Sequence, residues 1–476
     1  MIKIGTAKIS SNRLKLYTGL VLVLLATFIS PEIYLNTSLT PIEHRVIVIF
    51  VFAAVFWILE PIPIYATSMT IIVSLLLLVS DRGLNFMRTE GVGVLLPYQD
   101  IMATLASPII LLFLGGFFLA MGASKYGLDK YMAGMLLKPF GSNPRIVLLG
   151  IMSITALFSM FMSNTATTAM MLAILMTILS VFDPADKGRI AFALGIPLAA
   201  NIGGIGTPIG TPPNAIALKY FTGTDVISFG SWMVFGVPFV LVMLFISWVL
   251  LLWLFPISIK SLTLDFRKGN IKSPQSRTVL ITFFLTILLW LTDFLHGMNS
   301  YIVATIPVAV FLSAGIITRE DLKKLSWDVL WLVSGGIALG YALDKSNLAS
   351  NLISAIPFDT FPLLVLIVGA AFLAALMANF MSNTAAANLL LPLIAVIGTT
   401  LPGVEAIGGS KTMILSVALA CSMGMVLPIS TPPNALAHAT GLFSTKEMAR
   451  VGTIVGFIGL IVIFILMYLM NMIENL

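Results

Sequence analysis

Charged residues are scarce in this sequence. Of its 476 residues, 10% are charged and 59% are hydrophobic, whereas a soluble domain carries about a quarter charged residues. So little charge cannot cover a water-exposed surface, which excludes an ordinary soluble globular protein. The single cysteine, Cys421, excludes an internal disulfide, and the three histidines are too scattered for a zinc-type cluster. The net charge of +6 does not indicate nucleic-acid binding, and the informative question is where the positive charges lie.

Long apolar runs are what the sequence has in place of charge. Several approach the roughly 20 residues that cross a bilayer as a helix. They are Leu16–Ile29, Val46–Leu59, Thr70–Ser80, Phe239–Phe255, Val279–Leu291 and Ile454–Met470. The basic N-terminus has no convincing cleavage site after the first run, so we interpret that run as a retained helix. The chain is predicted to be an all-α polytopic membrane protein.

The basic residues predict the topology. Cytoplasmic loops of membrane proteins are enriched in Lys and Arg. A cytoplasmic N-terminus and about eleven transmembrane helices place every basic cluster inside, which puts the C-terminus outside. The clusters are Lys3, Lys8, Arg13 and Lys15; Lys125, Lys130, Lys138 and Arg145; Arg267, Lys268, Lys272 and Arg277; Arg319, Lys323 and Lys324; and Lys446 and Arg450.

Two apolar segments are interrupted by a short polar phrase. They are Arg145–Ser180 and Phe361–Thr399, and neither has a charged or turn-forming loop in its middle. Each arm has about 18 residues, which is short for a full crossing. We therefore predict two re-entrant hairpins that enter and leave on the same side of the membrane.

The hairpins belong to a duplication. The first carries "FMSNTATTAM" and the second "FMSNTAAANL"; "TPIGTPPN" follows the first and "PISTPPN" the second. Asn164 precedes Asn214 by 50 residues, and Asn383 precedes Asn434 by 51. The predicted topology makes the two copies inverted repeats. Inverted repeats with paired broken helices are typical of secondary transporters, whose site lies where the repeats meet; an anion channel is the more remote alternative.

The repeated phrases predict an anion site. A proline in the first helical turn suits Pro213 and Pro433, with Thr211 and Thr431 as N-caps. Ser163 and Ser382 begin the outgoing hairpin arms in the same way, which gives four helix N-termini, two from each repeat. Helix N-termini favour anions, so a ligand with two carboxylates, one for each repeat, fits this array. No Lys or Arg lies within these phrases, and we expect Lys219 near a membrane surface.

These motifs resemble those of the divalent anion/sodium symporter family of di- and tricarboxylate transporters, over nearly the whole chain. The resemblance implies a homodimer working by an elevator mechanism. It implies a scaffold of residues 1–124 (spans 1–4) and 256–345 (spans 7–9), and a transport domain of residues 125–255 (first hairpin, broken span 5, span 6) and 346–476 (second hairpin, broken span 10, span 11).

The resemblance also implies a site. Substrate carboxylates would contact Ser163, Asn164, Thr165, Thr211, Pro212, Ser382, Asn383, Thr384, Thr431 and Pro432. A first Na⁺ site would use Ser159, Ser163, Asn164 and Gly210, and a second would use Asn383 and a carbonyl near Ser430. At the second site Ala378 stands where Ser159 stands in the first, so this site lacks a hydroxyl.

The predicted function is secondary-active transport, across the plasma membrane, of C4-dicarboxylates and related anions such as succinate, malate, fumarate or 2-oxoglutarate. The missing hydroxyl at Ala378 favours exchange of one dicarboxylate for another, and Na⁺-coupled symport is the alternative. We expect no cofactor apart from Na⁺ as a coupling ion. An intramembrane enzyme is disfavoured because candidate acids and bases such as Asp293 and His296 fall near loop ends.

Overall fold

The structure is a computed structural model that describes residues 2–29, 39–221, 226–262, 273–348, 351 and 361–474. These residues form helices and turns, and the β contact between Ser80 and Leu96 is an isolated bridge. Eight of the described helices are long and apolar enough to cross a membrane. The prediction of an all-α polytopic membrane protein is thus confirmed, while the eleven-span count and the re-entrant course of the hairpins stay predictions.

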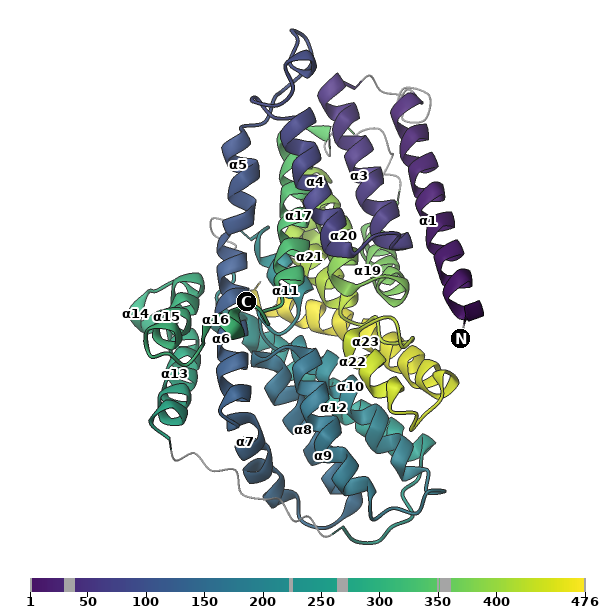
Figure 1. Ribbon diagram of the computed structural model, residues 1–476, viewed down its shortest axis with the longest axis vertical. Coiled ribbons are helices and arrows are strands. Elements are labelled where there is room, and N and C mark those ends of the chain that lie inside the picture. The colour runs from purple at the N-terminus through teal and green to yellow at the C-terminus, as the bar shows by residue number, and fades with distance from the viewer. Residues whose placement is uncertain are drawn as a thin grey trace. The chain divides into compact units, whose positions relative to one another are not determined.

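The chain divides into two compact units. The first contains residues 1–110, 326–370 and 384–417. Within it α4 packs against α3, α5 and α17, and α1 packs against α3 (Figure 1). Its helices, with α19, α20 and α21 continuing into the second unit, are α1 (Ile2–Phe28), α3 (Pro41–Leu59), α4 (Ile64–Leu78), α5 (Tyr98–Ala103), α17 (Trp327–Lys345), α19 (Leu363–Phe380), α20 (Asn383–Thr400) and α21 (Gly409–Cys421).

The second unit contains residues 111–325, 371–383 and 418–476. Its helices are α6 (Pro108–Lys125, whose first turn belongs to the first unit), α7 (Leu128–Leu137), α8 (Pro144–Phe161), α9 (Asn164–Leu179), α10 (Gly188–Gly204), α11 (Pro212–Leu218), α12 (Phe229–Leu254), α13 (Pro274–Leu291), α14 (Asp293–His296), α15 (Ser300–Ser313), α16 (Arg319–Leu322), α22 (Pro432–Ala439) and α23 (Thr445–Glu474). This division follows internal contacts; the scaffold and transport domains stay a prediction.

Helices α8 and α10 form the interior of the second unit. α8 packs against α7, α9, α10 and α12 (Figure 1), and 72% of its apolar window is buried, against 28% for α23. A close approach makes this packing possible: a Cβ on Gly203 would lie 2.4 Å from the Ala156 Cα. Helix α10, which ends at the first break, is therefore surrounded by protein and not exposed to lipid. Interrupted helices are tolerated at membrane depth under this condition.

Helix starts follow local capping chemistry. Thr40 and Glu43 form a capping box ahead of α3, and Asn143 accepts a hydrogen bond from the Arg145 N–H ahead of α8. Pro41 and Pro144 occupy the first helical positions, where a missing N–H removes no helical hydrogen bond. Short polar phrases thus divide the apolar runs into separate helices.

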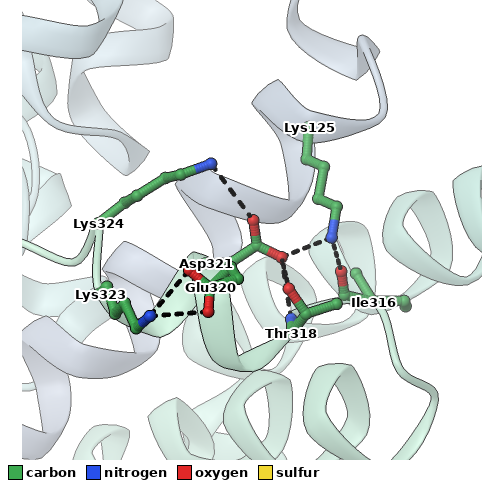
Figure 2. A network of polar contacts seen from close by, with 7 residues as sticks. All are labelled: Lys125, Ile316, Thr318, Glu320, Asp321, Lys323 and Lys324. Carbon is green, nitrogen blue, oxygen red and sulfur yellow. Dashed lines mark hydrogen bonds and ion pairs between the residues drawn. The ribbon is translucent and has the colours of Figure 1, made fainter.

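A partly buried ion pair joins the end of α6 to α16 in the second unit. The Lys125 Nζ at the end of α6 lies 2.5 Å from the Asp321 Oδ2 and donates to the Ile316 carbonyl at 2.8 Å (Figure 2). The Lys125 ammonium, together with the Thr318 N–H and hydroxyl, holds the pKa of the Asp321 carboxyl well below its usual range. The pair brings together two basic loops that the sequence predicts on the same side of the membrane.

We expect Asp321→Asn to lower the melting temperature of the purified protein by about 2 °C or more, because Lys125 then loses its buried counter-charge. Since the folded pKa of Asp321 is lowered, the stabilisation is present at neutral pH and is lost as the pH falls below the ordinary Asp value of about 3.9. Thermal unfolding at pH 7 measures the change.

The control is Lys323→Ala, which removes the exposed pair with Glu320 and should change the melting temperature little. Equal shifts for the two variants would contradict a special role for the pair of Lys125 and Asp321.

Candidate functional site

Each hairpin turns through two residues. α8 ends at Phe161 and α9 begins at Asn164; α19 ends at Phe380 and α20 begins at Asn383. The asparagine of each SNT phrase is therefore the first residue of the outgoing helix, as the sequence predicts. Of the ten candidate substrate residues, all but Thr384 lie in the second compact unit.

The N-terminus of α9 offers unused donors. The first N–H groups of a helix have no partner within it, and the Ser163 side chain makes no capping bond to them. Ser163, Asn164 and Thr165 are half-buried and Ala166 is exposed. The N–H groups of Asn164, Thr165 and Ala166 can therefore reach a bound anion without breaking any helical hydrogen bond.

The two broken helices restart as predicted but with fewer backbone donors than expected. α11 begins at Pro212 and α22 at Pro432, with Thr211 and Thr431 as N-caps. Two prolines open each helix, so the first two helical positions lack an N–H. These termini therefore present hydroxyls more than backbone N–H groups. The hydroxyls differ: Thr431 accepts from the Asn434 N–H at 3.3 Å, while Thr211 makes no capping bond.

Side chains satisfy the backbone that the first break exposes. The Asn214 Nδ2 donates to the carbonyls of Gly204, at 3.1 Å, and Thr207, at 2.8 Å. The Trp232 Nε1 donates to the Ile205 carbonyl at 3.0 Å. The Gly210 carbonyl, by contrast, accepts no hydrogen bond from the residues that the structure describes. Its oxygen is thus available to a ligand that needs an acceptor.

A hydroxyl fastens each break to its own hairpin. In the first repeat the Thr207 hydroxyl donates to the Met160 carbonyl and accepts from the Gly210 N–H. In the second the Ser430 hydroxyl donates to the Asn379 carbonyl, at 3.0 Å, and accepts from the Leu427 N–H.

The hydroxyl therefore sits at the first position of the loop in one copy and at the fourth in the other. The Asn379 side chain adds two bonds in the second copy, to the Val426 N–H and to the Ala375 carbonyl. Each hairpin and its break are held together as one piece by these bonds.

Oxygen atoms proposed for the first Na⁺ site lie together. The Ser159 hydroxyl is 2.6 Å from the Asn164 Oδ1 and 2.7 Å from the Ala200 carbonyl. A Cβ on Gly204 would lie 2.9 Å from both the Asn164 amide and the Gly210 carbonyl. The serine has one proton to donate. When it donates to Ala200, Ser159 and Asn164 both present lone pairs beside the Gly210 carbonyl.

The second proposed Na⁺ site differs at one atom. Ala378 is fully buried, and no donor from the described part of the chain reaches the buried Asn383 Oδ1. Among the described residues the Ser430 carbonyl also accepts no hydrogen bond. The missing hydroxyl thus removes one oxygen ligand, and it leaves the Asn383 oxygen as an unpaired acceptor, which costs free energy unless a ligand supplies the positive partner.

The repeats meet around α22, which packs against α9 and α10 (Figure 1). The Asn201 Nδ2 of α10 donates to the Asn434 Oδ1 at 2.9 Å. Asn201, Thr207 and Asn379 are not among the residues predicted from the sequence. Each of the three is a polar side chain within an apolar stretch, and this pattern could have marked it as a candidate. Its hydrogen-bond partners could not be predicted, because they lie too far away along the chain for residue spacing to indicate them.

Comparisons with known proteins identify the family. The family model described as citrate transporter (CitMHS) matches residues 54–409. The chain belongs to this family. The sodium-dependent dicarboxylate transporter SdcS of Staphylococcus saprophyticus is 32% identical over 463 residues, covering 89% of this chain and 85% of that relative. SdcS of Staphylococcus aureus is 32% identical over 466 residues with the same coverages.

These matches bear out the resemblance found from the sequence and identify this member of the citrate transporter family as a membrane transporter, not an enzyme. Two solved transporters share its fold. Alcanivorax borkumensis YdaH gives a TM-score of 0.54 at 14% identity, covering 78% of this chain and 87% of that chain. Neisseria gonorrhoeae MtrF, described as an antimetabolite efflux pump, gives 0.51 at 13%, covering 85% and 94%. At these identities the likeness shows the fold alone.

Gly204→Ala tests the first junction. The added Cβ meets the Asn164 amide and the Gly210 carbonyl, so we expect substrate affinity to fall about tenfold or more as the turn is displaced. The measurement is the substrate-dependent shift in melting temperature.

Gly369→Ala is the control, because nothing lies within 4 Å of its added Cβ. The Gly369→Ala variant has the same increase in helical propensity as Gly204→Ala, and it should bind substrate as tightly as the wild type does. Equal binding by both variants would show that the contact around Gly204 does not shape the site.

Proposed function

We propose that this transporter carries C4-dicarboxylates and related anions, such as succinate, malate, fumarate or 2-oxoglutarate, and that Na⁺ is the coupling ion. The observation that carries the proposal is the junction of Ser159, Asn164 and the Gly210 carbonyl beside the N-terminus of α9. Donors for an anion and acceptors for a cation meet there. The name of the SdcS relatives supports both parts.

The anion half of the proposal rests on the first turn of α9 and on the break of the second repeat. A carboxylate accepts hydrogen bonds only, and α9 has donors without helical partners. Thr431 adds a hydroxyl from the second break. A two-carboxylate ligand held by both repeats uses these donors, whereas a single small anion leaves part of the array unpaired.

The cation half follows from a count of charge. A dicarboxylate brings two negative charges, and no Lys or Arg lies within residues 161–165, 205–214, 380–384 or 422–434. A helix N-terminus carries roughly half an elementary charge, so α9 offsets about half a charge and leaves about one and a half. Two Na⁺ balance this remainder to within about half a charge. The ligands of one would be the Ser159, Asn164 and Gly210 oxygens, and those of the other the Asn383 and Ser430 oxygens.

Exchange remains the second candidate, and Ala378 is the observation that favours it. We now prefer Na⁺ coupling because the Asn383 oxygen is an unpaired buried acceptor and because of the SdcS names. We further propose eleven spans with two re-entrant hairpins, a homodimer, an elevator movement of the predicted transport domain, and a plasma-membrane location with the N-terminus cytoplasmic and the C-terminus outside.

The test is uptake of labelled succinate into proteoliposomes. We expect uptake into liposomes that contain no dicarboxylate, driven by an inward Na⁺ gradient and absent when choline replaces Na⁺. Uptake that needs internal dicarboxylate and ignores Na⁺ would instead establish exchange. No saturable uptake of any dicarboxylate under either condition would refute both candidates.

Two reciprocal variants serve as controls for the cation sites. Ser159→Ala gives the first site the composition of the second, and Ala378→Ser does the reverse. Loss of one oxygen ligand should raise the half-saturating Na⁺ concentration about tenfold in Ser159→Ala, and Ala378→Ser should lower it. Unchanged Na⁺ dependence in both would exclude these residues as ligands.

A further inference from the structure

Asn201 joins the two repeats. It lies in α10 of the first repeat and is 3% exposed. Its Nδ2 is 3.2 Å from the Thr431 Oγ1 and 2.9 Å from the Asn434 Oδ1. Both acceptors belong to the break of the second repeat. One amide of the first repeat is therefore bonded to two residues at the start of α22.

These bonds determine what the Thr431 hydroxyl can do. A hydroxyl has one proton and two acceptor positions. Asn201 and the Asn434 N–H, at 3.3 Å, both donate to the Thr431 oxygen. With both acceptor positions occupied, the proton of Thr431 must point elsewhere, and no described residue accepts it. The hydroxyl is held ready to donate.

The first repeat lacks the reciprocal bond. Asn214 and Asn434 correspond at an offset of 220 residues, and the same offset pairs Asn201 with Cys421. A thiol is a weak donor. The Asn214 Oδ1, which corresponds to the bonded Asn434 Oδ1, is buried and has no hydrogen-bond partner among the residues that the structure describes. The cross-repeat amide bond is therefore made once, and the hydroxyls of Thr431 and Thr211 are not equivalent.

We propose that Asn201 is a positioning residue for substrate: it fixes the Thr431 hydroxyl as a donor to one carboxylate of the ligand. The inference rests on the proposed function, since it takes a substrate carboxylate as the acceptor of the Thr431 hydroxyl proton. In the second repeat Cys421 stands at the position of Asn201, so this position offers Thr211 of the first repeat no equivalent amide bond, and the two ends of the ligand are held unequally.

The experiment compares Asn201→Leu, Thr431→Val and the double variant in succinate uptake. Asn201→Leu removes the donor while keeping a similar shape. We expect it to raise KM about five- to thirtyfold while Vmax stays within about twofold. Because Asn201 acts through Thr431, the double variant should be no worse than Thr431→Val alone.

Asn201→Asp is the second variant and applies if Asn201→Leu does not fold. It keeps the shape but replaces the donor with an acceptor, so Thr431 donates to it rather than to substrate, and KM should rise further. Cys421→Ala, at the corresponding position of the other repeat, should leave KM unchanged.

Three outcomes would overturn the inference. The first is an unaltered KM in Asn201→Leu. The second is a lower melting temperature and a lower Vmax with unchanged KM, which indicates a purely structural role. The third is additive losses in the double variant. Failure of the proposed function is seen separately, as absence of dicarboxylate uptake by the wild type, and the inference would then fall with it.

Discussion

Backbone polar groups that a broken helix exposes inside a membrane protein must find partners within the protein. At the first break the Asn214 amide and the Trp232 indole take up carbonyls that α10 can no longer use. At the second break the Asn379 side chain accepts from the Val426 N–H, and the Ser430 hydroxyl donates to the Asn379 carbonyl. Because these side chains satisfy most of the exposed groups, the loops are fixed in shape, and the Gly210 and Ser430 carbonyls and the first turn of α9 are left for ligands.

Much of this framework could be predicted from the sequence, because capping and proline chemistry act over a few residues. The starts of α9, α11 and α22 follow directly from the SNT and TPP phrases. The prolines that identify the breaks also remove N–H donors, so these two termini contribute less to anion binding than the count of four N-termini implied. Proline thus both marks the start of a helix and removes N–H donors from it, and the prediction from the sequence used only the first of these effects.

The long-range hydrogen bonds could not be predicted from the sequence. Asn201 and Thr431 are 230 residues apart, and nothing in local spacing links them. Thr207 and Ser430 perform the same task from different positions of their loops, so alignment of the repeats does not pair them. The repeats therefore have similar arrangements that use different atoms: Ser159 in the first repeat corresponds in position to Ala378 in the second, and Asn201 corresponds to Cys421. In the proposed site, this inequality would give each end of a two-carboxylate ligand its own set of contacts.

The most direct measurement is a structure of the protein determined with succinate and Na⁺. The account predicts one carboxylate within about 3 Å of the first N–H groups of α9 and the other within the same distance of the Thr431 hydroxyl, with cation density among the Ser159, Asn164 and Gly210 oxygens. Succinate bound away from both hairpin turns, or bound there while the Thr431 hydroxyl points away from it, would contradict the account.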